Sequence, residues 1–130
     1  MNDFETDVFN AVYDGIVPRY IAEGNFRSES VREYKRLPLA TLIRMDSIPD
    51  WSRESTSDEE DLTIDTYESH VYAETMDECK EIANAIAGRM QQMNFRRLTM
   101  RPVLNGNDPA ISQIVMRFEH RINHKGQMFR

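Results

Sequence analysis

The feature that most constrains this sequence is a long amphipathic helix predicted over residues 75–94, with strand-like segments on both sides of it. Its apolar residues recur at steps of three and four, which places them on one stripe of an α-helix. The stripe consists of Met76, Cys79, Ile82, Ala83, Ile86, Ala87, Met90 and Met93. Thr75 and Glu78 have the spacing of a capping box at the helix start. A stripe of this length needs a sheet to cover it.

Four other segments have the composition of β-strands, because they alternate apolar and polar residues or are rich in β-branched ones. They are residues 39–48, 63–73, 96–104 and 111–122. Pro38 and Pro49 bound the first of them, and Asn105-Gly106 predicts a turn between the last two. The sequence therefore predicts a sheet that ends in a hairpin.

Alternation along two of these strands predicts which side chains reach the core. In 63–73 the inward set is Tyr67, Ser69, Val71 and Ala73. The residues between them, Glu68, His70 and Tyr72, are expected to face solvent or a partner. In 111–122 one face is expected to hold Ile114, Met116, Phe118 and His120.

The N-terminal part is less regular. A short helix is predicted over 3–14, with one side formed by Phe4, Val8, Ala11 and Val12. Gly15 follows it as a stop signal, and Pro18 is tolerated near the start of a short edge strand expected in 16–23. Residues 24–36 are polar and irregular, so they are predicted to form a loop.

The order of these elements is helix, strands, helix, hairpin, which favours an α+β fold with a mainly antiparallel sheet and two helices packed on one side. At 130 residues the chain is expected to be a single domain, 1–130. No apolar run approaches the ~20 residues that span a bilayer. The acidic N-terminus lacks the basic start of a signal peptide, so we expect no secretion.

The charge distribution indicates surface contacts of opposite sign. The net charge of −6 argues against a protein whose main task is gripping nucleic acid, because that task rests on phosphate neutralisation. Arginines are frequent in 19–53 and 89–101, whereas 54–61 is almost purely acidic. Copies of one subunit could dock head to tail through such segments, although a solvated surface would have the same composition.

The segment 50–61 is predicted to be a flexible loop in the isolated protein, because its Ser and acidic residues bury little apolar surface. Trp51 is the exception within it. The acidic cluster Asp58, Glu59, Glu60 and Asp61 could be a solvated charge run, a subunit or DNA-repelling surface, or a site for a hard cation. The tail 123–130 is expected to be frayed.

The sequence contains no arrangement of residues typical of catalysis, so no catalytic, cofactor-binding or metal-binding residues are predicted. The single cysteine, Cys79, lies on the helix stripe and is expected to be a small core residue without a disulfide. His120 and His124 have ligand spacing for a helix, but on a strand they are about 13 Å apart, too far to share an ion.

Three segments taken together resemble the tail-terminator or tail-completion proteins of long-tailed bacteriophages. They are KRLPLATLIRMDS, TYESHVYAETMDECKEIANAIAGRM and MNFRRLTMRPVLNGNDPAISQIVMRFEHRI. The positions that match the family pattern are Pro38, Tyr67, Val71, Tyr72, Ile82, Ala83, Pro102, Val103, Asn107, Asp108, Ile111, Arg117 and Phe118. The resemblance covers about residues 4–122, and all of its motifs are structural rather than catalytic.

The resemblance implies a structural role without enzymatic activity. Such subunits form a ring, commonly a hexamer, that caps the head-proximal end of the tail tube, stops its polymerisation and contacts the head connector. The implied partners are copies of the same chain, the tail tube protein and a neck protein, within a virion assembled in the host cytoplasm. DNA passes through the ring, and an acidic lumen would repel it.

A ring needs two unlike faces on each subunit. The candidates from the sequence are Arg27, Arg32, Arg36 and Arg53 on one side and the acidic cluster on the other, and Trp51 is a further candidate for the interface. Two alternatives remain open. One is a head-completion or other neck protein, and the other is a small enzyme or metal-binding domain that uses His70, His120, His124 and the acidic cluster.

Overall fold

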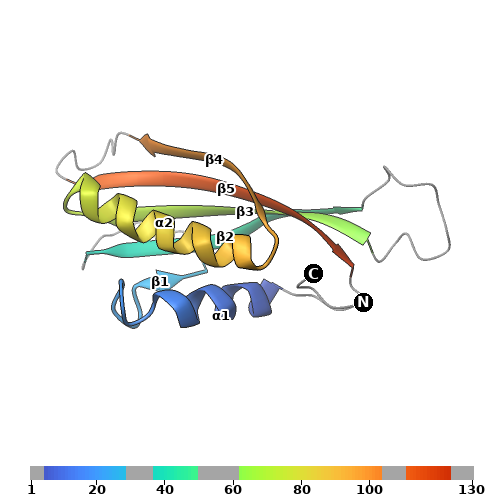
Figure 1. Cartoon of the computed structure of the whole chain (residues 1–130), viewed down its shortest axis with the longest axis horizontal. Helices are drawn as coiled ribbons and strands as arrows, with labels where there is room; N and C mark the ends of the chain where they lie inside the picture. Colours follow the sequence, from blue (N-terminus) through green and yellow to red (C-terminus); the bar gives the residue numbers. More distant parts are fainter. Residues whose placement is uncertain (1–4, 29–36, 50–61, 104–110, 124–130) are drawn as a thin grey trace.

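A computed structural model describes residues 5–28, 37–49, 62–103 and 111–123 (Figure 1). It contains two helices and a sheet, which confirms the predicted α+β fold. The elements in chain order are α1 (Glu5–Ile16), β1 (Phe26–Arg27), β2 (Leu39–Pro49), β3 (Leu62–Ala73), α2 (Met76–Gln92), β4 (Arg96–Val103) and β5 (Ser112–Asn123).

The five strands form one sheet in the order β1-β2-β3-β5-β4. All neighbours are antiparallel except β1 and β2, which run parallel. The pairing of β4 with β5 confirms the predicted hairpin, whereas the turn expected at Asn105-Gly106 lies outside the described residues. β5 also pairs with β3, so the last of the described strands completes the centre of the sheet.

The helix α2, Met76–Gln92, lies within the predicted range 75–94 and has most of the predicted stripe buried. Thr75 caps its first turn, because its Oγ1 accepts a hydrogen bond from the Glu78 backbone N–H at 3.2 Å. Met76 is only partly buried, and the rest of the predicted stripe is buried: Cys79, Ile82, Ala83, Ile86, Ala87, Met90 and Met93. The helix lies across β3 and β5 (Figure 1), whose buried residues complete the core.

The helix α1 packs beside α2 on the same face of the sheet and buries Val8, Val12 and Ile16. The prediction that Gly15 ends this helix was wrong, because α1 continues to Ile16. Gly15 instead allows a close approach of α2. A Cβ at this position would overlap Cδ and Nε of Arg89, which donates from Nε and Nη2 to the Ala11 carbonyl at 3.0 and 2.7 Å.

The prediction of an edge strand in 16–23 was also wrong. The chain turns there, with the Tyr20 backbone N–H donating to the Ile16 carbonyl at 2.8 Å. The edge strand is β1, inside the segment predicted to be a loop, and it pairs with Ala40 and Thr41. Phe26 holds it in place, because its ring stacks on Phe9 of α1 at a centroid distance of 4.9 Å.

The sheet alternates as predicted on its helix-covered side. Tyr67, Ser69, Val71 and Ala73 are buried there, as are Ile114, Met116 and Phe118. His120 shares that side with Phe118, as predicted, and its ring lies 5.1 Å from that of Phe95. Tyr72 points to the opposite side, as predicted, but it is only 6% exposed, so of the two surroundings expected for it, solvent or a partner, solvent is excluded in the single chain.

Candidate interaction surface

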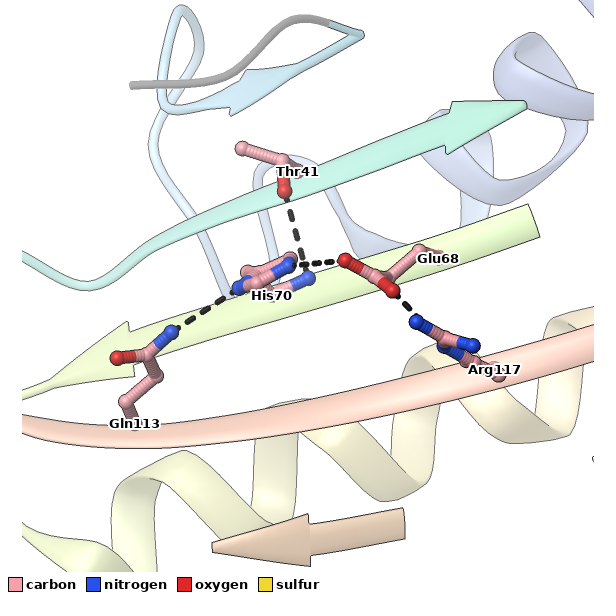
Figure 2. Close-up of polar contacts among 5 residues, drawn as sticks. All are labelled: Thr41, Glu68, His70, Gln113 and Arg117. Atoms are coloured by element: carbon pink, nitrogen blue, oxygen red, sulfur yellow. Dashed lines mark hydrogen bonds and ion pairs between the residues drawn. The ribbon is translucent and has the colours of Figure 1, made fainter. Parts of the chain in front are cut away.

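The opposite side of the sheet, here called the helix-free face, carries a connected group of polar side chains. Strand alternation places Glu68 and His70 of β3 on this face, and the β-sheet register brings Thr41 of β2 and Arg117 of β5 beside them. Gln113 of β5 completes the group (Figure 2). Neither α1 nor α2 packs on this side, yet Thr41 and Tyr72 are only 2% and 6% exposed there, so this face is partly exposed.

The five residues form a continuous chain of contacts across three strands. Gln113 Nε2 lies 3.0 Å from His70 Nδ1, and His70 Nε2 lies 2.7 Å from Glu68 Oε1. The other Glu68 oxygen accepts a hydrogen bond from Arg117 Nε at 2.9 Å. The backbone N–H of His70 donates to Thr41 Oγ1 at 3.3 Å. Figure 2 shows His70 at the centre of the network, with Glu68 held between His70 and Arg117.

The protonation of this network follows from its geometry. An ionised carboxylate can only accept hydrogen bonds, so His70 Nε2 carries a proton and donates to Glu68. In the neutral ring, Nδ1 then accepts from the Gln113 amide. Partial burial raises the pKa of Glu68, but hydrogen bonds from His70 and Arg117 and the attraction of their charges outweigh it, so this pKa lies below its usual value.

The helix-free face is ordered and balanced in charge. Next to the network, the Tyr72 ring is stacked near that of His70 at a centroid distance of 6.2 Å. Toward the sheet edge, Arg96 of β4 pairs with Glu119 of β5 at 2.7 Å. Glu68 and Glu119 therefore each have an arginine partner on this face, Arg117 and Arg96 respectively.

Both ring nitrogens of His70 have protein partners, so neither is left to act on a substrate. The Cys79 thiol lies elsewhere, fully buried, where Sγ donates to the Val71 carbonyl at 3.2 Å. Burial raises the pKa of Cys79 to about 11, so the thiol is protonated at neutral pH. Among the described residues, no group of three or more His, Cys, Asp or Glu side chains could hold a metal ion.

A second polar cluster lies on the helix-covered side of the sheet, around Asp65. This residue is fully buried, and its Oδ1 accepts from Ser47 Oγ at 2.7 Å and from Thr63 Oγ1 at 2.8 Å. Its other oxygen, Oδ2, has no hydrogen-bond partner within the described part of the chain. Asp65 was not predicted to be buried. It lies two residues before Tyr67 on β3, so strand alternation places it on the same side as the predicted inward residues.

The network on the helix-free face was also missed as a unit. The sequence places Glu68 and His70 two residues apart on one side of a strand, which is the signal that they share a face. Arg117 was included only as a position that matches a family pattern. What joined these residues to Gln113 was the register between β3 and β5, and single-strand patterns do not contain that information.

The interface residues predicted from the sequence are described in only one case. Arg27 lies on β1, exposed, and its Nε donates to the Gly24 carbonyl at 3.0 Å. The others lie outside the described residues: Arg32, Arg36, Trp51, Arg53, Asp58, Glu59, Glu60 and Asp61. Contact between the arginine-rich and acidic segments therefore stays a prediction. His124, the second histidine of the pair with ligand spacing, is likewise outside.

No helix in the described ranges is both long and apolar enough to cross a membrane. Neither a protein-family model nor a curated protein matches this sequence.

Proposed function

We propose that this chain is a structural subunit of a bacteriophage virion, of the tail-terminator type. In this proposal, copies of the chain form a ring at the head-proximal end of the tail tube, stop its polymerisation and join the tail to the head connector. The sequence resemblance over about residues 4–122 suggests this role, and the α+β fold agrees with the element order expected from that resemblance.

The observation that carries the proposal is the helix-free face. Glu68 and Arg117 at its centre are already paired and hydrogen-bonded, so less side-chain entropy is lost when a partner covers them. The face is also built on the three central strands, where a sheet is most rigid. A polar network held in place by hydrogen bonds fits a permanent neighbour in an assembly, such as the tube, the connector or another copy of the chain.

The overall charge fits the passage of DNA through such a ring. With a net charge of −6, a ring of several copies carries a strongly negative field that disfavours phosphate binding. The subunits would therefore line a channel without holding the DNA. Which residues face the channel is tested by placing the helix-free face in images of the assembled ring.

The test is to follow purified tail tube protein as it polymerises, with and without this chain, by negative-stain microscopy and light scattering. Tubes that stop growing and carry a distinct cap at one end support the proposal. A matched variant, Glu68→Gln with Arg117→Gln, removes the central ion pair of the helix-free face and should weaken capping.

Tubes that lengthen unchanged in the presence of folded protein would refute the terminator role. Binding to the portal or connector protein without any effect on tubes would instead assign the chain to head completion. A purified sample with stoichiometric metal would favour the third alternative, a metal-binding domain.

A further inference from the structure

The two edges of the sheet are both open among the described residues. At one edge, β4 pairs only with β5. At the other, β1 covers β2 only at Ala40 and Thr41, so residues 42–49 of β2 have β3 as their sole described strand neighbour. An open edge presents backbone N–H and C=O groups that another strand can bind.

Each open edge carries one large exposed apolar side chain. Among the described residues, the exposed large hydrophobic side chains are Met45 at 50% and Leu98 at 42%. Met45 lies in β2 where the register with β3 shifts between Arg44 and Asp46. Leu98 lies in β4 at the corresponding irregularity, between Arg97 and Thr99. The two apolar residues therefore mark opposite edges of one sheet, each at a bulge.

The two edges also differ in charge. The strand β4 contains Arg96, Arg97 and Arg101 and no acidic residue. Asp46 is exposed at the β2 edge, and α1 lies beside this edge, where Glu5 pairs with Arg44 at 3.2 Å. The helix contributes three acidic residues and no basic one: Glu5, Asp7 and Asp14. The β4 edge is therefore basic, whereas the β2 edge holds Asp46 beside Arg44, whose charge is paired with Glu5, so the β4 arginines and Asp46 are complementary between copies.

The strand directions allow these edges to pair. Three successive antiparallel pairings, β2 with β3, β3 with β5 and β5 with β4, leave β4 running opposite to β2. A second copy that is shifted sideways without being turned end over end therefore presents its β4 antiparallel to β2 of the first. Antiparallel addition at an open edge is a common mode of strand recognition.

We propose that β4 of one copy docks along residues 42–49 of β2 in a second copy, with Leu98 covered by Met45 and the β4 arginines beside Asp46 and α1. The choice of a second copy as the occupant rests on the proposed ring function. The contact is head to tail, because each copy uses β4 toward one neighbour and β2 toward the other. Such a contact closes into a ring when the rotation between copies allows it.

The test uses two variants that keep side-chain size and remove apolar character, Leu98→Asn and Met45→Gln. Both positions are exposed in the single chain, so circular dichroism and thermal melting should match the wild type. In sedimentation velocity over a concentration series, wild-type protein should associate. Each variant alone should associate about tenfold more weakly, because its altered edge enters every contact.

Mixing the variants gives the sharpest result. The Met45→Gln chain keeps a normal β4 and the Leu98→Asn chain keeps a normal β2, so an equimolar mixture has one intact contact. It should form dimers with the affinity of a wild-type contact, and larger species should need a concentration about tenfold higher, because they require an altered contact. The alternative is that Leu98 of one copy packs against Leu98 of another. In that case Met45→Gln alone would associate like the wild type and mixing would add nothing, which would overturn the proposal.

Two further outcomes separate this inference from the proposed function. Wild-type protein that stays monomeric throughout the series, or variants that cap tubes as well as the wild type, would overturn the edge contact and leave tail termination standing. Wild-type rings that require both edges but leave tube growth unchanged would support the edge contact and refute tail termination.

Discussion

Replacing Gly15 with alanine is expected to lower the free energy of unfolding, although alanine is normally favoured over glycine inside a helix by about 0.5–1 kcal/mol. The new Cβ would overlap Cδ and Nε of Arg89, so the Arg89 side chain must swing away from the Ala11 carbonyl. It then loses two hydrogen bonds from a charged donor, together worth about 2–3 kcal/mol. The net loss is about 1–2 kcal/mol.

Gly88 provides a matched control in the other helix. Among the described residues, no heavy atom outside the surrounding turns of the helix lies within 4 Å of a Cβ added there, so Gly88→Ala should stabilise the protein by about 0.5–1 kcal/mol through helix propensity alone. Urea unfolding followed by far-UV circular dichroism measures both changes. The two glycine variants should therefore shift the unfolding midpoint in opposite directions.

A double-mutant cycle isolates the proposed cause. In an Arg89→Ala background the Gly15→Ala substitution meets no side chain, so its cost should disappear and the normal gain from alanine should return. If Gly15→Ala raises stability as much as Gly88→Ala in the wild-type background, the contact between the two helices is not what keeps this position small.

Three other predictions follow from the polar and buried groups. Because the pKa of Glu68 is lowered by folding, its stabilising contribution is complete above the unfolded-state pKa of about 4.3 and is lost as pH falls through the lower folded-state value. The difference in unfolding free energy between wild type and Glu68→Gln should therefore be about 1–2 kcal/mol at pH 7 and shrink toward pH 2, and a difference independent of pH would contradict this. Cys79, with its raised pKa and full burial, should resist iodoacetamide at pH 8 in the native protein and react after denaturation. Rapid labelling of the folded protein would show that the helix opens. Thr63→Val should destabilise the protein by about 1–3 kcal/mol, because the buried Asp65 carboxylate loses a donor. Thr66→Val on the same strand serves as the control in chemical denaturation, and equal effects would contradict the role given to Asp65.

Local patterns were enough to predict the elements that make their own periodic contacts. The α2 stripe and its Thr75 cap depend on residues within one helix, and the β3 alternation depends on one strand facing the helices. The strand β1 could not be predicted in this way. Two residues with no local strand signal are held there by the stacking of Phe26 on Phe9, a contact between distant parts of the chain.

The candidate surface, too, could be predicted only in part from local sequence patterns. The pattern places Glu68 and His70 on one side of β3, but the partners that fix their orientation, Gln113 and Arg117, are set by pairing with a strand more than forty residues later. Gly15 was misread for a related reason, because its neighbour Arg89 belongs to the other helix. The predicted interface of arginines and acids stays a prediction outside the described residues, apart from Arg27.

The position of β5 has a consequence for the order in which the protein folds during synthesis. β2 and β3 can pair as soon as both have left the ribosome, but the second edge of β3 waits until α2, β4 and finally β5 have emerged. Until then β3 exposes an unpaired edge, and the apolar stripe of α2 lacks Ile114, Met116 and Phe118. The last strand therefore completes the core and closes the central sheet in one late step. Nascent chains interrupted before β5 expose both an edge and an apolar helix face, which are the features that promote aggregation and recognition by chaperones.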